Sequence, residues 1–332
     1  MANLYVTEQG SHIRKTGDRI IVEKNADILL DIPCSKIDSV LIFGNVQFTT
    51  QMAHELFEHG IEMALLTRSG RLVGQLTSPV TKNIELRMAQ FRRYEDNEFR
   101  LDIARRIVRG KIGNCLSLMR SFSYNHPDRD LSSVTEGIKG SLSGIDDADS
   151  INALMGIEGS TARAYFGSFG RMILCDLEFP GRVKHPATDP VNALLSFGYT
   201  LVFNEIASLL DGLGFDPFLG FFHSVDYGRK SLASDLVEEF RASVDRFTLY
   251  LLNNRMIGES DFYTNQKSGG KYLVRDAMKR YFAEYERNIN RELVHPAGGT
   301  ATSLRKCFRM QAERLAAHIR GGDRYEPFGL EA

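Results

Sequence analysis

Hydrophobic and polar residues follow two different patterns along this 332-residue chain. In the first 78 residues they alternate in short runs, which predicts one short helix near residues 50–59 and strands near residues 4–6, 12–15, 19–23, 28–32, 40–43, 61–66 and 71–76. Beyond Ser78 and Pro79, which mark a boundary, the spacing is helical almost to the end. We therefore expect an α+β chain, with a small β-rich, sandwich-like domain at residues 1–78, a larger all-α domain at 79–322 and a flexible tail at 323–332.

A predicted helix near residues 231–251 presents two acidic residues on the side away from its apolar stripe. The stripe advances in steps of three and four through Leu232, Leu236, Phe240, Val244, Phe247 and Leu251. Asp235 and Glu238 are three residues apart, so they share a side of the helix. His223 lies shortly before this helix, and the three side chains could bind a divalent cation. The alternative interpretation is an ordinary solvated acidic face.

A further carboxylate, Glu158, lies on the apolar face of another predicted helix. Steps of four and three run through Ile151, Met155, Glu158, Ala162, Tyr165, Phe169 and Met172. An ionised carboxylate in a protein core is unfavourable, so we expect this one to be paired, protonated or bound to a metal. Its partner is then either a metal shared with His223 or an arginine such as Arg163 or Arg171.

Charge is unevenly distributed, although the net charge of the chain is only −1. Residues 82–111 contain nine Lys or Arg against five Asp or Glu, residues 267–320 contain twelve against five, and residues 127–158 contain two against seven. Basic segments on either side of a more acidic one favour a protein that holds a polyanion near metal-binding carboxylates. A solvated helical surface is the alternative for each basic segment.

The remaining composition predicts a cytoplasmic protein. Hydrophobic residues make up 43% of the chain, which is enough for one or two cores. The four cysteines form no C-x-x-C pair and are typical of a reduced compartment: Cys34, Cys115, Cys175 and Cys307. The sequence has no N-terminal signal pattern and no apolar run near the ~18 residues that span a bilayer. We therefore expect a soluble protein with no membrane segment.

Three segments carry a resemblance to a known family. They are residues 155–166 with Glu158, residues 189–199, and residues 220–241 with His223, Asp235 and Glu238. Together with the order of a β-rich and a helical domain, they resemble the CRISPR-associated adaptation integrases, the metal-dependent DNA endonucleases of spacer acquisition. The family usually reads Leu-Ala-Leu-Asp where this chain has Ser234 before Asp235. We expect a packing change there that leaves the ligands intact.

The resemblance implies a particular site and particular partners. In the family, the positions that match Glu158, His223 and Glu238 bind Mn²⁺ or Mg²⁺, with the position of Asp235 close beside them. Similar proteins form homodimers through the β-rich domain, and two such dimers flank a dimer of a small ferredoxin-like companion protein. The assembly holds a short DNA duplex and joins its 3′-OH ends to the CRISPR repeat by transesterification.

The chemistry of the residues agrees with this reaction. Carboxylate oxygens and one imidazole suit Mg²⁺ or Mn²⁺, which can polarise a phosphodiester and activate a hydroxyl. Asp235 would orient a ligand or accept a proton. Two alternative functions stay open, namely a non-catalytic DNA-binding scaffold and a metallohydrolase of small phosphoesters.

Several basic residues are candidate DNA contacts. Arg163, Arg229 and Lys230 lie close in sequence to the candidate ligands, so we expect them near the bound phosphate. Another group falls at or near helical spacing and is expected to bind the DNA backbone through one basic face: Lys267, Lys271, Arg275, Lys279 and Arg280.

Overall fold

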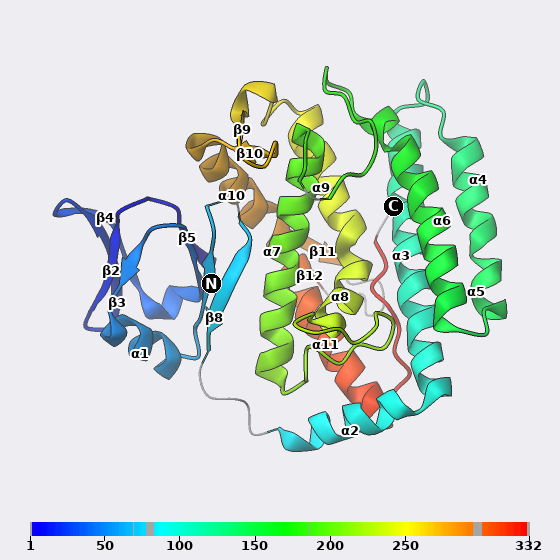
Figure 1. Ribbon diagram of the computed structural model, residues 1–332, viewed down its shortest axis with the longest axis horizontal. Coiled ribbons are helices and arrows are strands. Elements are labelled where there is room, and N and C mark those ends of the chain that lie inside the picture. Colours follow the sequence, from blue (N-terminus) through cyan, green and yellow to red (C-terminus); the bar gives the residue numbers. More distant parts are fainter. Residues whose placement is uncertain (1, 69, 78–82, 185, 295–300, 331–332) are drawn as a thin grey trace. The chain divides into compact units, whose positions relative to one another are not determined.

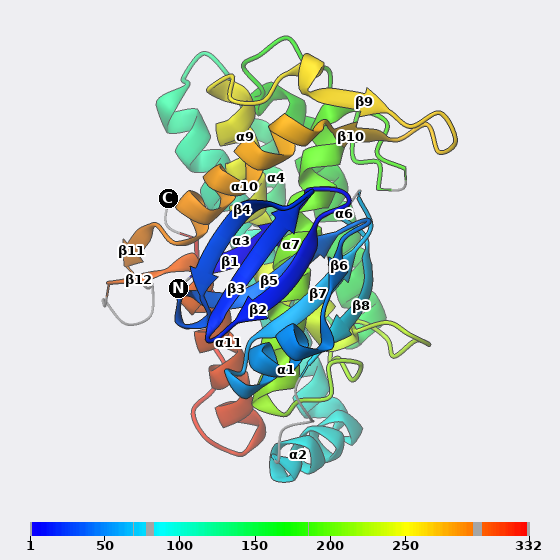
Figure 2. The same ribbon diagram turned by 90° about the vertical axis from the view of Figure 1, so that its left-hand side faces the viewer.

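The computed structural model describes residues 2–68, 70–77, 83–184, 186–294 and 301–330 (Figures 1 and 2). The expected boundary at Ser78 and Pro79 lies outside these residues. The chain divides into two compact units: unit 1 is Met1–Val80 with Leu273–Glu286, and unit 2 is Thr81–Tyr272 with Arg287–Ala332. The β-rich N-terminal region and the helical region that follows it are therefore both present, as the sequence predicts.

Two four-stranded sheets form most of unit 1, and Figure 2 shows one lying in front of the other. The first sheet has the strand order β1 (Ala2–Val6), β5 (Ile37–Phe43), β7 (Glu62–Leu66) and β8 (Leu72–Leu76). The second has the order β4 (Asp27–Pro33), β3 (Arg19–Lys24), β2 (His12–Thr16) and β6 (Gln47–Phe48). Both sheets are mixed, because β1, β5 and β7 run parallel while β8 is antiparallel to β7, and β6 runs parallel to β2 while β3 is antiparallel to it.

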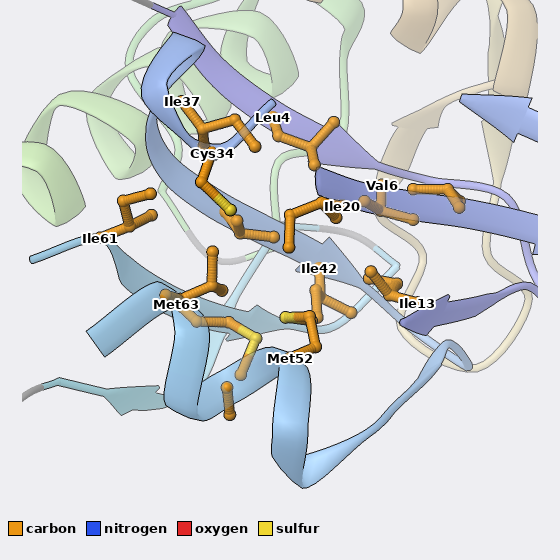
Figure 3. Packing of buried hydrophobic residues seen from close by; sticks show 14 residues of the cluster. Leu4, Val6, Ile13, Ile20, Cys34, Ile37, Ile42, Met52, Ile61 and Met63 are labelled. Atoms are coloured by element: carbon orange, nitrogen blue, oxygen red, sulfur yellow. The ribbon is translucent and has the colours of Figure 1, made fainter. Parts of the chain in front are cut away.

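The two sheets share one buried core with helix α1 (Thr50–Glu58), drawn in Figure 3. Ile13 and Ile20 from one sheet, Ile42 from the other and Met52 from α1 are each at most 2% exposed. Alternation along a strand sends every second side chain to the same face, so the inner faces of both sheets are apolar. The short 3-10 helix η1 (Cys34–Lys36) brings Cys34 to the same core.

Unit 1 also includes part of a helix from late in the chain. Helix α10 (Arg275–Ile289) contributes its residues up to Glu286. Phe282 on this helix stacks on Tyr5 of β1 with ring centroids 4.1 Å apart, and the Tyr5 hydroxyl donates a hydrogen bond to Glu286 Oε1 at 2.7 Å. The sequence assigned this stretch to the helical domain, because local periodicity does not reveal which core a helix joins.

Unit 2 is built mainly of helices (Figure 1). In chain order they are α2 (Ile84–Glu95), α3 (Asn97–Asn125), α4 (Ser132–Ser141), α5 (Ser143–Asp147), α6 (Ile151–Phe169), η2 (Gly170–Met172), α7 (Pro190–Leu213), α8 (Ser231–Val237), η3 (Glu238–Phe240), α9 (Arg241–Asn253), η4 (Glu259–Asp261) and α11 (Leu304–Ile319). Two short strand pairs occur after α9: β9 (Phe262–Thr264) with β10 (Lys271–Leu273), and β11 (Glu292–Val294) with β12 (Ala301–Ser303). The expectation of an all-α domain is therefore wrong in this detail.

Helix α7 is the long apolar helix of unit 2. The side chain of Asp189 caps it by accepting the Asn192 N–H at 2.8 Å, Pro190 occupies its first position, and Gly214 ends it in a left-handed conformation. It packs against α8, α9 and α11. By length and composition α7 could cross a membrane, but 67% of its most apolar window is buried inside the protein, as in an ordinary core helix.

The expected flexible tail is instead packed against unit 2. Tyr325 and Phe328 are 1% and 2% exposed, and Phe328 stacks on Phe240 with ring centroids 4.8 Å apart. Arg106 on α3 donates to the Tyr325 carbonyl at 2.7 Å. Polar residues and glycines suggested fraying, whereas two buried aromatic rings hold residues 323–330 in place; residues 331–332 lie outside the described part.

Candidate metal centre

A tight turn before helix α8 carries His223, and a buried carboxylate fixes that turn. Asp235 is 0% exposed, and its Oδ2 accepts the backbone N–H groups of Phe221 and Phe222 at 2.6 and 3.0 Å. Its Oδ1 accepts the His223 backbone N–H at 2.9 Å and lies 2.7 Å from His223 Nδ1. A proton on Nδ1 then donates to Asp235, which leaves Nε2 as a free ligand atom.

The turn approaches helix α8 so closely that only glycine fits at its start. A Cβ added at Gly220 would lie 2.7 Å from the Ser231 carbonyl carbon and 2.8 Å from Asp235 Oδ2. Because both neighbours are fixed by hydrogen bonds, neither can give way without moving the turn. The sequence predicts His223 and Asp235 as members of one site but does not show this direct contact.

Glu238 lies in η3, between α8 and α9, and is buried. Its side chain is 3% exposed, its Oε1 accepts a hydrogen bond from Arg241 Nε at 2.8 Å, and the same oxygen is 4.0 Å from His223 Nε2. One interpretation of the sequence placed Asp235 and Glu238 on a solvated acidic face of the helix. That interpretation is wrong, because helix α3 packs against η3 and α9 and covers this side as well.

Lys111 on helix α3 links Glu238 to the third candidate ligand. Its Nζ is 2.5 Å from Glu238 Oε2 and forms an ion pair with Glu158 Oε1 on α6. The partner of Glu158 is thus a lysine rather than Arg163 or Arg171, which are both exposed. With a side chain 23% exposed, Glu158 borders the site instead of occupying a core position.

Opposite charges dominate the electrostatics of this cluster. Burial by itself would raise the pKa of Glu238, but the positive charges of Arg241 and Lys111 hold that pKa well below its ordinary value. Burial also acts against the charged form of Lys111, yet the negative charge of Glu238 keeps the pKa of Lys111 above its ordinary value. Glu238 and Lys111 are therefore both ionised at neutral pH.

Sequence reasoning missed Lys111, although the signal was the same as for Glu158. Ile103, Ile107, Lys111 and Cys115 follow one another at steps of four, and the other three are buried apolar residues. A lysine on the apolar stripe of a helix needs a buried negative partner, just as a carboxylate there needs a positive one. Lys111 and Glu158, each on the apolar stripe of its own helix, therefore pair with each other.

A buried hydrogen-bonded network of two tyrosines and an aspartate lies next to Arg241. Asp245 is 1% exposed, accepts a hydrogen bond from the Tyr165 hydroxyl at 2.9 Å and another from the Tyr199 hydroxyl, and burial raises the pKa of Asp245 to about 6. The Arg241 guanidinium lies over the Tyr199 ring, 4.7 Å from its centre. A cavity of about 20 Å³, with room for one water molecule, lies between this network and Lys111.

The C-terminal segment holds the residue next to Glu238. Glu239 is 0% exposed, and its carboxylate accepts hydrogen bonds from the Tyr325 hydroxyl at 2.5 Å, Gln311 Nε2 at 2.9 Å and the Phe328 N–H at 2.8 Å. Burial outweighs these bonds and raises the pKa of Glu239 to about 7. The chain end that the sequence described as a tail therefore anchors η3.

The candidate DNA contacts are spread over different surroundings. Arg163 on α6 and Arg229 before α8 are exposed, and Lys230 Nζ is 3.3 Å from Asp211 Oδ2. Lys271 lies on strand β10 and pairs with Glu259 at 2.7 Å, whereas Arg275 begins α10 and pairs with Glu8. The expectation of one helical face containing Lys271 and Arg275 is therefore wrong, because the helix begins only at Arg275.

The structure therefore defines a two-unit class of protein, in which a β-rich unit accompanies a helical unit with a charged site. The site contains three carboxylates, an imidazole and a lysine: Glu158, Asp235, Glu238, His223 and Lys111. The chain belongs to the family of CRISPR associated protein Cas1, whose model matches residues 4–287. The resemblance found in the sequence is thereby confirmed.

Known proteins support this assignment over almost the whole chain. The chain is 34% identical to CRISPR-associated endonuclease Cas1 1 of Chlorobaculum tepidum over 334 residues, which covers 98% of this chain and 97% of that protein. Among solved structures, a casposase bound to integration product is similar with a TM-score of 0.88 at 21% identity, covering 98% of this chain and 93% of that one. A Cas6-RT-Cas1–Cas2 complex is similar with a TM-score of 0.84 at 25% identity, covering 100% of this chain and 36% of that one.

Proposed function

We propose that this protein is a divalent-metal-dependent endodeoxyribonuclease and integrase of CRISPR adaptation. It would insert short DNA spacers into the CRISPR array by attack of a 3′-OH on a phosphodiester of the repeat. Its relative from Chlorobaculum tepidum is named an endonuclease, and a structural neighbour is a casposase bound to integration product. Its site of action would be the cytoplasm, where the array resides.

The observation that carries this proposal is the position of Lys111. Its ammonium group sits between carboxylates from two different helices, Glu158 and Glu238, close to a histidine held by Asp235. The two carboxylates both face the Lys111 ammonium. Together with the imidazole they form a donor set suited to a divalent ion. A purely structural ion pair would need neither the second carboxylate nor the oriented imidazole.

Glu158, His223 and Glu238 would be the ligands of Mg²⁺ or Mn²⁺. Their ligand atoms do not all lie within 4.8 Å of one another in this structure, where Lys111 lies between the two glutamates, so binding would require Lys111 to move and the glutamates to approach the ion. Glu238 Oε2 is buried and lies 2.5 Å from Lys111 Nζ, with no second hydrogen-bond donor among the described residues. When bound, the ion would supply Lewis-acid stabilisation of charge on a phosphodiester.

The protein's own residues prepare the site for that ion. Asp235 fixes the ring of His223 through Nδ1 and directs Nε2 toward Glu238. Arg241 neutralises one oxygen of Glu238 and is itself held by the Tyr199 ring. Lys111 keeps the two glutamates close together until the divalent cation takes its place.

DNA binding would rest on the candidate basic residues, which belong to both units. Arg163 and Arg229 are exposed, and Lys230, Lys271 and Arg275 would exchange their carboxylate partners for phosphates. Each phosphate contact contributes a slope of roughly 0.9 to the dependence of log affinity on log salt. Changing Arg163 and Arg229 to Ala should flatten this slope by up to about two units, and an unchanged slope would remove both from the DNA interface.

The protein would act as a homodimer together with a small ferredoxin-like companion. Strand β4 lies at the edge of its sheet beside β3 and exposes three successive apolar residues, Ile28, Leu29 and Leu30. An apolar edge of this kind favours pairing with a second copy. Ile28→Glu with Leu30→Glu should convert a dimer to a monomer in light scattering, and a variant that stays dimeric would exclude this edge.

Titration of Mn²⁺ with a labelled branched DNA duplex tests the function. We expect the wild type to cleave and to join strands only with the ion, and Glu238→Gln to lose on the order of 10³-fold in rate while still binding DNA. Glu136→Gln, at an exposed position on α4, is the matched control and should keep the wild-type rate. Binding without cleavage by the wild type would indicate a scaffold, and turnover of small phosphoesters alone would indicate a metallohydrolase.

A further inference from the structure

A second cluster of metal-ligand side chains lies in unit 1, apart from the candidate centre of unit 2. Cys34 from η1 and Glu55 and His59 from α1 each place one ligand atom within 4.8 Å of the other two. Cys34 is 1% exposed and Glu55 is 8% exposed, while the His59 side chain is 41% exposed. The cluster therefore has a buried floor and one side open to solvent.

The geometry of helix α1 explains why Glu55 and His59 meet. They are four residues apart, so they lie on the same side of the helix, and His59 is its C-terminal cap. His59 Nδ1 is 2.9 Å from the Glu55 backbone carbonyl oxygen. The same nitrogen is 3.6 Å from Glu55 Oε1, so Nδ1 is the ring atom that faces the Glu55 carboxylate and could bind an ion shared with it.

We propose that Cys34, Glu55 and His59 form a zinc site in the β-rich unit. Zinc takes sulfur, imidazole nitrogen and carboxylate oxygen together in four-coordinate sites, which is the donor set present here. Solvent supplies the fourth ligand through the open side at His59. The hard, sulfur-free set of Glu158, His223 and Glu238 favours Mg²⁺ or Mn²⁺ instead, so the two sites differ in the ion that they select.

Lys15 supplies a positive charge at this cluster in the absence of a metal. Lys15 Nζ forms an ion pair with Glu55 Oε2, and its side chain is 36% exposed, so it can turn into solvent when zinc binds. Burial, and then the charge of Glu55, raises the pKa of the Cys34 thiol. The free site therefore holds a neutral thiol, and zinc binding forms a zinc–sulfur bond and releases the thiol proton to water. Zinc with one thiolate and one carboxylate leaves no net charge in the core.

Cobalt substitution tests this proposal with the full-length protein. Co²⁺ bound by a thiolate gives a charge-transfer absorption band that oxygen and nitrogen ligands alone do not give. We expect this band in the wild type, its loss in Cys34→Ser, and its removal when Zn²⁺ is added. Cys175→Ser, at the partly exposed cysteine, is the matched control and should retain the band. Glu238→Gln should retain it as well, because none of the three candidate ligands of the other site is a cysteine.

Two further variants keep the test decisive if Cys34→Ser fails to fold. His59→Ala changes an exposed side chain and should weaken Zn²⁺ binding at least ~100-fold in competition with a chromophoric chelator. Lys15→Met removes the competing cation and should tighten Zn²⁺ binding roughly tenfold. A wild-type protein with no thiolate band, or a band and a zinc affinity that His59→Ala leaves unchanged, would overturn the proposal.

Discussion

Each unit contains a buried glutamate paired with a lysine, but the two lysines differ in their access to water. In unit 1 the Lys15 side chain is 36% exposed and pairs with Glu55. In unit 2 the Lys111 side chain is 13% exposed and pairs with both Glu158 and Glu238. The first lysine can leave its partner for solvent at little cost, whereas the second is confined between two carboxylates.

This difference indicates what each lysine does. A buried carboxylate needs a counter-ion in every state of the protein, and a lysine is the counter-ion that the chain itself supplies. Where the lysine reaches water, a metal can replace it easily, and the folded unit depends little on the pair. Where it is enclosed, the pair is part of the core, and its replacement by a metal costs more free energy.

The largest expected effect is on stability. Glu238→Gln leaves Lys111 and Arg241 in the core without their main negative partner and should lower the free energy of unfolding by about 3 kcal/mol. Glu55→Gln should cost much less, because Lys15 can move into solvent. Urea unfolding followed by circular dichroism measures both. Equal losses in the two variants would show that burial does not distinguish the two pairs.

A second expected effect is a pH dependence of the unfolding free energy that comes from Glu239, the residue after Glu238. Because burial raises its pKa from 4.5 to about 7, the folded protein holds a proton there that the unfolded chain releases. The stabilisation from this proton is complete below pH 4.5 and is lost as the pH rises through about 7. Relative to Glu239→Gln, the wild type should therefore lose up to about 3 kcal/mol of unfolding free energy over that range.

Unfolding titrations at several pH values check this second effect. Glu326→Gln is the matched control on the same C-terminal segment, since the Glu326 side chain is 64% exposed. It should follow the wild-type pH dependence. A Glu239→Gln protein with that same dependence would mean that Glu239 is ionised in the folded state and titrates normally.

Much of the fold followed from periodicity, while its long-range pairings did not. Alternation predicted the β-rich region, and three- and four-residue steps predicted the helices that carry Glu158 and Asp235. Periodicity reports which side of a helix is apolar, but not what covers the other side. For this reason the burial of Glu238 and the packing of Tyr325 were missed, since both depend on segments far away in sequence.

The candidate site was predicted in its members but not in its contacts. Glu158 was identified as a charge on an apolar stripe, and His223, Asp235 and Glu238 as a histidine before a helix with two acidic residues on one side. The family resemblance then implied that Glu158, His223 and Glu238 share a metal. Lys111 was hidden because its partners lie on α6 and η3, and no local pattern joins three helices. Part of helix α10 belongs to unit 1 for a similar reason, since the stacking of Phe282 on Tyr5 is a long-range contact.

A smaller effect is expected from the residue that holds the histidine. Asp235→Asn keeps the size of the side chain but loses an acceptor for the backbone N–H groups of the turn, so the ring of His223 is less well oriented. Changes of this kind reduce metal affinity by about 10- to 100-fold. Isothermal titration calorimetry measures the Mn²⁺ affinity of the variant. Asp226→Asn, at an exposed position in the same turn, is the control. An unaltered affinity would show that His223 does not depend on Asp235.

The most direct test of the central claim is the Mn²⁺ affinity of Lys111→Met. If Lys111 occupies the place of the divalent cation between Glu158 and Glu238, its removal should tighten Mn²⁺ binding roughly tenfold, which is about 1.4 kcal/mol. In the same calorimetric titration Glu238→Gln should bind no Mn²⁺ at this site. A Lys111→Met protein with the wild-type affinity, together with a Glu238→Gln protein that still binds the ion, would contradict the metal centre proposed here.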